Sequence, residues 1–192
     1  IDETGKEYIN RMSSAAERMQ KMINDLLTFS RVSTKASPFS TVELDKIFEN
    51  VLSDLELMIE KKKAKITING SFPIIEADEN QLNQLFSNLI SNAIKYQPSD
   101  NIPEIIISHS LKDDNIEITI QDNGIGIDLQ YKELIFQPFQ RLHGKGEYEG
   151  SGIGLAICKK IVDRHKGTID IESETGKGSK FIIQLPLKQN SQ

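Results

Sequence analysis

The chain has 192 residues, which at roughly 150 residues per domain allows one full domain with one modest extra element and excludes two large domains. Hydrophobic residues make up 38%, enough for one core, and 23 basic against 28 acidic residues give a net charge of −5. Residues 1–36 carry six basic and five acidic side chains, which leaves −6 on the remainder. A protein that binds nucleic acid through its overall electrostatic field carries a net positive charge, so we expect no nucleic-acid partner here. Any phosphate must then be bound by a local site.

Cys158 is the only cysteine, which excludes an intrachain disulfide and a multi-cysteine zinc site and favours a reducing compartment. We expect its thiol to be a small, buried, apolar group. No apolar run approaches the roughly 18 residues of a membrane span, and residues 1–4 lack the features of a signal peptide. We therefore expect a cytoplasmic chain that makes no membrane contact and, because it does not begin with Met, a fragment of a longer protein whose own membrane attachment stays open.

The first 34 residues predict one long helix. Its apolar stripe has the 3-4 spacing of a bundle or coiled-coil seam, in the order Ile9, Met12, Ala16, Met19, Ile23, Leu26 and Ser30. Met22, Leu27 and Phe29 widen the stripe, which favours a four-helix bundle over a two-stranded coil. The alternative is an ordinary amphipathic helix docked on its own domain.

Small and helix-breaking residues at 33–40, with Pro38 among them, place a domain boundary after Ala36, so we expect a helical segment 1–36 and a domain 37–192. Asp78 predicts an N-cap with Gln81 as the reciprocal partner of a capping box. Expected strands are 42–44, 64–69, 74–77, 104–111, 115–121, 168–173 and 179–187, and expected helices are 44–63, 78–97 and 152–165. Strands and helices without regular alternation indicate an α+β fold, a two-layer sandwich with helices on one face of a largely antiparallel sheet.

Asn88, Asn92 and Lys95 share one polar stripe of the helix that begins after Asp78. Asparagine is a mediocre helix former, and its amide oxygen is a hard neutral ligand of the kind Mg²⁺ accepts, while lysine can meet a phosphate as a point charge. A solvated helix face is the alternative.

Residues 122–126, Asp-Asn-Gly-Ile-Gly, directly follow an alternating strand. Asp122 at the strand end can point into a pocket and accept a hydrogen bond from an exocyclic amine such as that of adenine, and Gly124 permits a sharp turn. A plain Asp-Asn-Gly turn is the alternative, but Gly126 has no evident turn requirement, which favours a site.

Residues 150–154, Gly-Ser-Gly-Ile-Gly, lead into the helix expected at 152–165, and glycine amides at a helix N-terminus form an anion site. The loop matches neither a Walker A motif nor a dinucleotide fingerprint. Residues 137–149 carry Arg141, His143 and Lys145 and read as a mobile lid whose cations close over phosphates. We expect His143 to be exposed and the helix dipole to favour the charged form of His165.

Five ordered segments together resemble the N, G1, F, G2 and G3 boxes of sensor histidine kinases: 88–96 (Asn-Leu-Ile-Ser-Asn-Ala-Ile-Lys-Tyr), 122–126, 136–139 (Phe-Gln-Pro-Phe), 150–155 and 176–181 (Gly-Lys-Gly-Ser-Lys-Phe). Residues 139–143 and 147–150 look closest to the phytochrome-like branch. Residues 5–32 resemble the second helix of the dimerisation and phosphotransfer hairpin that precedes the catalytic domain, so the resemblance covers essentially the whole chain.

The resemblance implies the ATP-binding fold shared with gyrase and MutL-type ATPases, with ATP and Mg²⁺ as cofactors. In it Asp122 accepts from the adenine amine with help from Ser179, Asn88 and Asn92 hold Mg²⁺, Lys95 contacts phosphate and Tyr96 flanks the base. The remaining expected ATP-binding positions are Gly124, Gly126, Arg141, Gly150, Gly152, Gly154 and Leu155. The gyrase and MutL-type ATPases have a glutamate where this chain has Asn88, and because an amide cannot take a proton from water, slow hydrolysis and transfer to a protein nucleophile are expected.

The family's acceptor histidine lies on the first hairpin helix, and no histidine precedes His109 here. We expect ATP binding without autophosphorylation, a homodimer through the hairpin and a response regulator receiver domain as the downstream partner in two-component signalling. A serine-directed kinase of the same fold and a degenerate ATP-binding module are the alternatives; the helical seam disfavours the first and the intact glycine sites disfavour the second. The stimulus, the cognate regulator and cis or trans transfer are not predictable from these residues.

Overall fold

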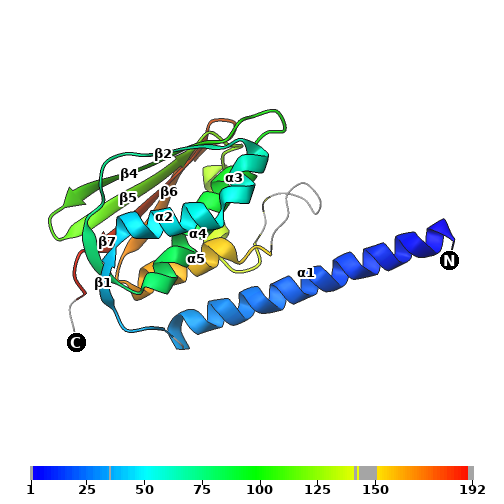
Figure 1. The fold of residues 1–192 in the computed structure, drawn as a ribbon, viewed down its shortest axis with the longest axis horizontal. Coiled ribbons are helices and arrows are strands. Elements are labelled where there is room, and N and C mark those ends of the chain that lie inside the picture. Colours follow the sequence, from blue (N-terminus) through cyan, green and yellow to red (C-terminus); the bar gives the residue numbers. More distant parts are fainter. Residues whose placement is uncertain (1, 35, 141, 143–150, 190–192) are drawn as a thin grey trace.

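The computed structural model describes residues 2–34, 36–140, 142 and 151–189. A long helix, α1 (Glu3–Thr34), is followed by a sandwich of one mixed sheet and a helical layer (Figure 1). The sheet has the order β2-β4-β5-β7-β6, made of β2 (Lys65–Ile68), β4 (Glu104–Lys112), β5 (Asn115–Asp122), β7 (Gly178–Pro186) and β6 (Thr168–Glu174). Only β2 and β4 pair in parallel, so the expected α+β sandwich with a largely antiparallel sheet is confirmed.

Alternating isoleucines bury one face of the sheet. Ile118 of β5 lies opposite Ile183 of β7, and Ile107 of β4 lies opposite Ile120, all with essentially no exposed surface. Helices α2 (Leu44–Asp54), α4 (Glu79–Lys95) and α5 (Gly154–Arg164) cover this face (Figure 1). The buried side chains of the strands and those of α4 therefore form one core. The buried apolar residues of α4 are Leu82, Leu85, Phe86, Leu89, Ile90, Ala93 and Ile94.

Several element bounds differ from the sequence expectation. The helix expected at 44–63 is two helices, α2 and α3 (Glu56–Lys62), because Leu55 leaves helical geometry at φ −96° and ψ 2°. Leu52, Leu55 and Ile59 all pack against the core. The helix expected from Gly152 begins at Gly154, since Gly152 has a φ of +76°. The first strand, β1 (Ser40–Glu43), pairs with β3 (Ile74–Ala77) as a separate two-stranded ribbon.

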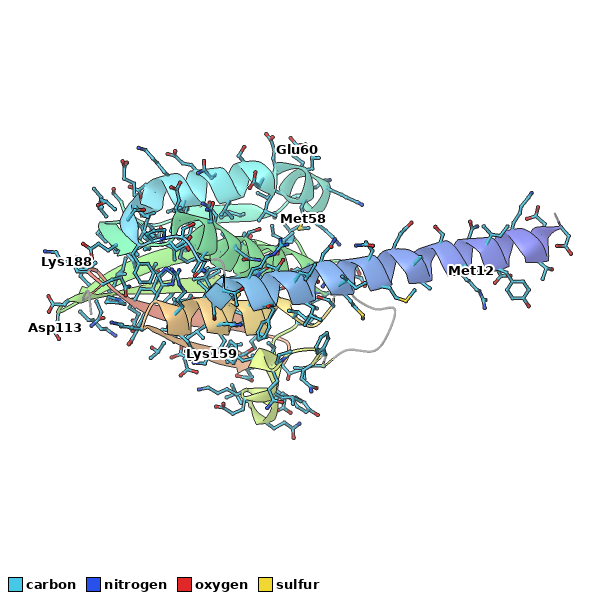
Figure 2. All side chains as sticks on the ribbon, turned by 90° about the horizontal axis from the view of Figure 1, so that it is seen from below. Met12, Met58, Glu60, Asp113, Lys159 and Lys188 are labelled. Atoms are coloured by element: carbon cyan, nitrogen blue, oxygen red, sulfur yellow. The ribbon has the colours of Figure 1, made fainter. Side chains whose placement is uncertain are left out.

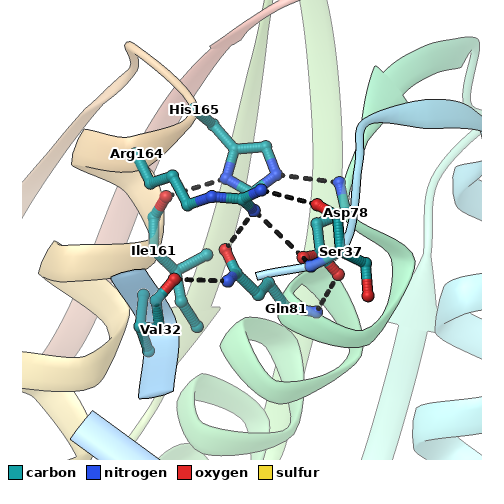
Figure 3. A network of polar contacts seen from close by, with 7 residues as sticks. All are labelled: Val32, Ser37, Asp78, Gln81, Ile161, Arg164 and His165. Atoms are coloured by element: carbon teal, nitrogen blue, oxygen red, sulfur yellow. Dashed lines mark hydrogen bonds and ion pairs between the residues drawn. The ribbon is translucent and has the colours of Figure 1, made fainter. Parts of the chain in front are cut away.

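A polar network joins the C-terminal end of α1 to α4 and α5 (Figure 3). The guanidinium of Arg164 donates to the Asp78 carboxylate at 3.0 Å, to Gln81 Oε1 at 2.9 Å and to the Ser37 carbonyl at 2.6 Å. Gln81 Nε2 donates to the Val32 carbonyl at 2.8 Å. The end of α1 and the segment after it are therefore held by side chains of the sandwich.

Two sequence expectations fail in this network. Asp78 does cap α4 by accepting from the Gln81 backbone amide, but the Gln81 side chain bonds Val32 and Arg164 and does not return to Asp78 as a capping box requires. His165 is fully buried; its Nε2 accepts from the Asp78 amide at 3.1 Å, so Nδ1 carries the proton and donates to the Ile161 carbonyl. Burial lowers the pKa of His165, which outweighs the helix dipole and favours the neutral ring.

The N-terminal part of α1 extends past the sandwich, as Figure 2 shows at Met12. Side chains of the predicted seam are exposed there: Met12 is 71% exposed, Met19 59% and Leu26 49%. Phe29 and Val32, nearer the C-terminal end of α1, instead pack against the core. No helix in the described part of the chain is long and apolar enough to cross a membrane.

Candidate nucleotide site

A pocket of about 380 Å³ lies between α4, the end of β5, the start of β7 and the N-terminus of α5. This volume is within the range of small-ligand sites. Ten of the expected site residues line it, namely Asn88, Asn92, Lys95, Tyr96, Asp122, Gly126, Gly152, Gly154, Leu155 and Ser179. Gly124 is buried and does not line the pocket. Arg141, Gly150 and most of the expected lid, His143 included, lie outside the described residues.

Asp122 ends β5 and is held by two backbone amides on the same oxygen. Gly124 N donates to Asp122 Oδ1 at 2.8 Å and Ser179 N donates to it at 3.2 Å. Burial nevertheless raises the pKa of Asp122 from 3.8 to about 6, because the two amides only partly offset the loss of solvent. Oδ2 accepts no hydrogen bond from the described residues, which leaves it available to a donor in the pocket.

Ser179 is fixed by its neighbour on β6. Ser173 Oγ accepts from Ile127 N at 2.8 Å, donates to the Gly178 carbonyl at 2.8 Å and lies 2.9 Å from Ser179 Oγ. Because the Ser173 proton is used on Gly178, Ser179 donates its own proton to Ser173 and keeps its lone pairs for the pocket. Asp122 and Ser179 together therefore present acceptors, which suits a ligand that brings an N–H or a water.

Close backbone contacts require both glycines of the loop that follows Asp122. A Cβ on Gly124 would overlap the Tyr96 carbonyl oxygen, and one on Gly126, which has a φ of +69°, would overlap the Glu174 carbonyl oxygen. The expectation that Gly126 lacks a turn requirement is thus wrong. The loop packs so closely on α4 and on the β6–β7 turn that side chains are excluded, and this packing sets the position of Asp122.

The polar stripe of α4 lies in the pocket as expected. Asn88 Nδ2 donates to the Gly154 carbonyl at 3.4 Å, and the Asn92 side chain has no hydrogen-bond partner among the described residues. Lys95 Nζ donates to the Tyr96 hydroxyl at 3.0 Å and lies 4.2 Å from the centre of its ring. Two amide oxygens beside a helix N-terminus fit Mg²⁺, which takes few protein ligands and keeps waters and phosphate oxygens.

The N-terminus of α5 offers donors to an anion. Its cap residue is Ile153, whose side chain cannot accept a hydrogen bond, and Ile157 N is the donor that closes the first turn on Ile153 O at 2.9 Å. The amides of Gly154 to Ala156 therefore have no partner within the helix. Gly154 and Leu155 line the pocket, so the positive end of the helix dipole faces it.

The apolar floor and part of the rim were not indicated by the sequence pattern. Ile125, Ile127, Ile135, Ile157 and Phe181 form much of the floor. Asp25 of α1 and Met58 of α3 lie in the lining, as does Gln84 of α4. Cys158 is buried beneath α4, as expected; its Sγ donates weakly to the Leu85 carbonyl at 3.8 Å and burial raises its pKa to about 12. Within the described residues no group of three or more His, Cys, Asp or Glu could hold a metal ion.

The pocket lining combines a carboxylate acceptor, an uncapped helix N-terminus and two amide side chains, a set of groups that suits a nucleotide. Residues 77–189 match the family described as histidine kinase-, DNA gyrase B-, and HSP90-like ATPase, and the chain belongs to this family. It carries the catalytic ATP-binding domain found in histidine kinases of two-component systems.

Individual relatives agree with this family. The phytochrome-like protein Cph1 of Synechocystis is 41% identical over 97% of this chain, which confirms the likeness to the phytochrome-like branch. The chain spans about a quarter of the length of that relative and of another phytochrome, from Nostoc. The histidine kinase ThkA, solved in complex with the response regulator TrrA, superposes with a TM-score of 0.74 at 26% identity, covering 97% of this chain and 52% of that one. Full-length ShkA in complex with AMPPNP has a TM-score of 0.77 at 21% identity, covering 100% and 41%.

Proposed function

We propose that this chain is the ATP-binding catalytic core of a sensor histidine kinase that transfers the ATP γ-phosphoryl group to a histidine outside the chain, for relay to a response regulator aspartate. In this reaction the bond between the γ-phosphorus and the bridging oxygen breaks, a phosphorus–nitrogen bond forms and ADP leaves. The observation that carries the proposal is that a partly buried acceptor, Asp122, and the uncapped N-terminus of α5 line one pocket.

The adenine end of the site is formed by Asp122, Ser179 and Tyr96. Asp122 Oδ2 accepts a hydrogen bond from the adenine amino group, and Ser179 accepts one from a water that bridges to the ring. Tyr96 flanks the base, and its hydroxyl is held by Lys95 at 3.0 Å. The apolar floor excludes water beneath the base, which strengthens the charged hydrogen bond to Asp122.

The phosphate end is formed by the α5 N-terminus and the α4 stripe. Backbone amides cradle the phosphates; they belong to Gly152, Gly154 and Leu155. Lys95 reaches a phosphate oxygen as a point charge. Arg141 and Gly150 complete this end in the proposal, as residues outside the described part of the chain. Gly124 and Gly126 act by holding the Asp122 loop in place.

Asn88 and Asn92 would hold Mg²⁺ through their amide oxygens. When bound, Mg²⁺ neutralises part of the phosphate charge and orients the terminal phosphate. Neither amide can take a proton from an attacking water, which favours transfer to an external nucleophile.

We also propose that residues 1–36 form half of a helical hairpin, with the domain boundary near Ala36, and that two chains dimerise through it. The exposed seam of Met12, Met19 and Leu26 supports this part of the proposal. A response regulator receiver domain is the proposed partner, in line with the ThkA complex. A cytoplasmic location follows from the same role.

Incubation with Mg²⁺ and γ-labelled ATP tests the proposed function. The chain should bind one nucleotide and acquire no acid-labile label, whereas a form extended to include the helix with the acceptor histidine should become labelled. Stoichiometric acid-labile label on the 192-residue chain would contradict the placing of the acceptor outside it. Failure to bind ATP would contradict the proposed function as a whole.

A further inference from the structure

Helix α1 contributes a side chain to the nucleotide pocket. Asp25 lies in the pocket lining together with Gln84 and Asn88 of α4, although it is about 60 residues away from them in the sequence. None of the site residues expected from the sequence comes from α1. Asp25 and Asp122 are the two carboxylates in the lining formed by the described residues, and Asp122 belongs to the proposed adenine end.

Contacts of α1 with the sandwich fix which face of the helix turns inward. Lys160 Nζ donates to the Phe29 carbonyl at 2.8 Å and lies 4.3 Å from the centre of the Phe29 ring, and Gln81 Nε2 donates to the Val32 carbonyl at 2.8 Å. Asp25, Phe29 and Val32 are spaced i, i+4 and i+7 and therefore share one helix face. That face carries the contacts to α4 and α5, so Asp25 is turned toward them.

The same contacts place Asp25 along the helix axis. Lys160 of α5 contacts Phe29, and Arg164 donates to the Ser37 carbonyl, so α1 and α5 run in the same direction here. Asp25 lies one helical turn before Phe29, and Ala156 lies one turn before Lys160, so Asp25 is close to the first turn of α5. Asn88, which lines the same pocket, donates to the Gly154 carbonyl at the start of that turn at 3.4 Å. This is the phosphate and cation end of the pocket.

We propose that Asp25 is a positioning residue for the magnesium-bound nucleotide, an inference that rests on the proposed function. Its carboxylate is partly buried and has no hydrogen-bond or ion-pair partner among the described residues. A carboxylate at this end repels a bare triphosphate and attracts the Mg²⁺ ion that Asn88 and Asn92 would hold on it. Asp25 therefore makes the pocket select the metal-bound form, and it makes this selection depend on the docking of α1.

Nucleotide affinity measured with and without magnesium tests the proposal. AMPPNP is titrated into the wild type, Asp25→Asn and Glu17→Gln, once with excess Mg²⁺ and once with EDTA. Asp25→Asn should bind the magnesium complex about threefold more weakly and bare AMPPNP about threefold more tightly, the scale of one partly exposed ion pair. The ratio of the two dissociation constants should then fall about tenfold.

Glu17→Gln is the matched control, because it removes the same charge from an exposed position of the same helix outside the pocket lining. Its ratio should equal that of the wild type. The proposal is overturned if Asp25→Asn leaves the ratio of the two dissociation constants unchanged. It is also overturned if both affinities shift in the same direction, as a purely structural role would give. Failure of the wild type to bind AMPPNP in either condition would instead overturn the proposed function.

Discussion

Replacing Asp122 with asparagine should stabilise the unliganded chain and weaken ATP binding. The amide oxygen that Asp122→Asn introduces can still accept from Gly124 N and Ser179 N, so the substitution removes the charge and keeps both hydrogen bonds. The rise in the pKa of Asp122 from 3.8 to about 6, at about 1.4 kcal/mol per pH unit, corresponds to about 3 kcal/mol that opposes the ionised carboxylate in the folded state. Because the amide is also desolvated, we expect Asp122→Asn to gain about 1–2 kcal/mol at pH 7.

The sign of the pH dependence follows from the raised pKa. A carboxyl group whose pKa is higher in the folded state stabilises the fold most below its unfolded value of 3.8 and loses that contribution as pH rises through about 6. The advantage of Asp122→Asn should therefore be largest at pH 7 and nearly absent at pH 4. ATP affinity of the wild type should also fall as pH drops below 6, because the protonated carboxyl is a weaker acceptor.

Asp122→Asn should stabilise the fold but weaken nucleotide binding. In Asp122→Asn the two backbone amides hold the amide oxygen, so the side chain presents its NH₂ group to the adenine amine. A charged hydrogen bond is thereby replaced by two donors that face each other. The expected cost is about 3 kcal/mol, or about 100-fold in affinity. Thermal and urea unfolding at pH 7 and pH 4, with calorimetric titration of AMPPNP, measure both effects. Asp114→Asn, in an exposed turn, is the control. A variant that is less stable than the wild type at pH 7, or that binds AMPPNP equally well, would refute this reasoning.

Three further outcomes are expected. Arg164→Ala should destabilise the chain by about 3 kcal/mol in urea unfolding, because it removes the ion-pair partner of Asp78, which is 2% exposed. Arg11→Ala, which breaks an exposed pair, should cost under about 0.5 kcal/mol, and equal losses would count against the network. Gly152→Ala, at a φ of +76°, should weaken AMPPNP binding about tenfold or more and adenosine binding little; an equal loss for both would argue against the phosphate role. Native Cys158 should resist iodoacetamide at pH 8 until the chain unfolds, because burial raises its pKa to about 12, and rapid native labelling would contradict that burial.

The sequence predicted the parts of the site that depend on local spacing. Asn88, Asn92 and Lys95 share a helix stripe, and Asp122 and Gly152 adjoin their own strand and helix, so a motif of a few residues is enough to locate each. The strand alternation likewise located the sheet and its buried face. Neighbours along the chain determine these features, and they are found where expected.

What could not be predicted depends on contacts between distant segments. Asp25 and Met58 reach the pocket from α1 and α3 only because of how those helices dock, and no local pattern indicates it. Gln81 bonds Val32 and Arg164 in place of closing a capping box, and burial overrides the helix dipole at His165. Gly126 is required by its contact with Glu174, about 50 residues away, which the loop sequence alone does not reveal.

The most direct test of the central claim, that this pocket binds Mg²⁺-ATP with adenine against Asp122, is a calorimetric comparison of Mg·AMPPNP with Mg·GMPPNP. Guanine presents a carbonyl oxygen where adenine presents the amine, and the Asp122 carboxylate repels that oxygen. One AMPPNP per chain, bound at least about 30-fold more tightly than GMPPNP, is the predicted result. Equal affinity for the two nucleotides, or no binding of either, would contradict the account.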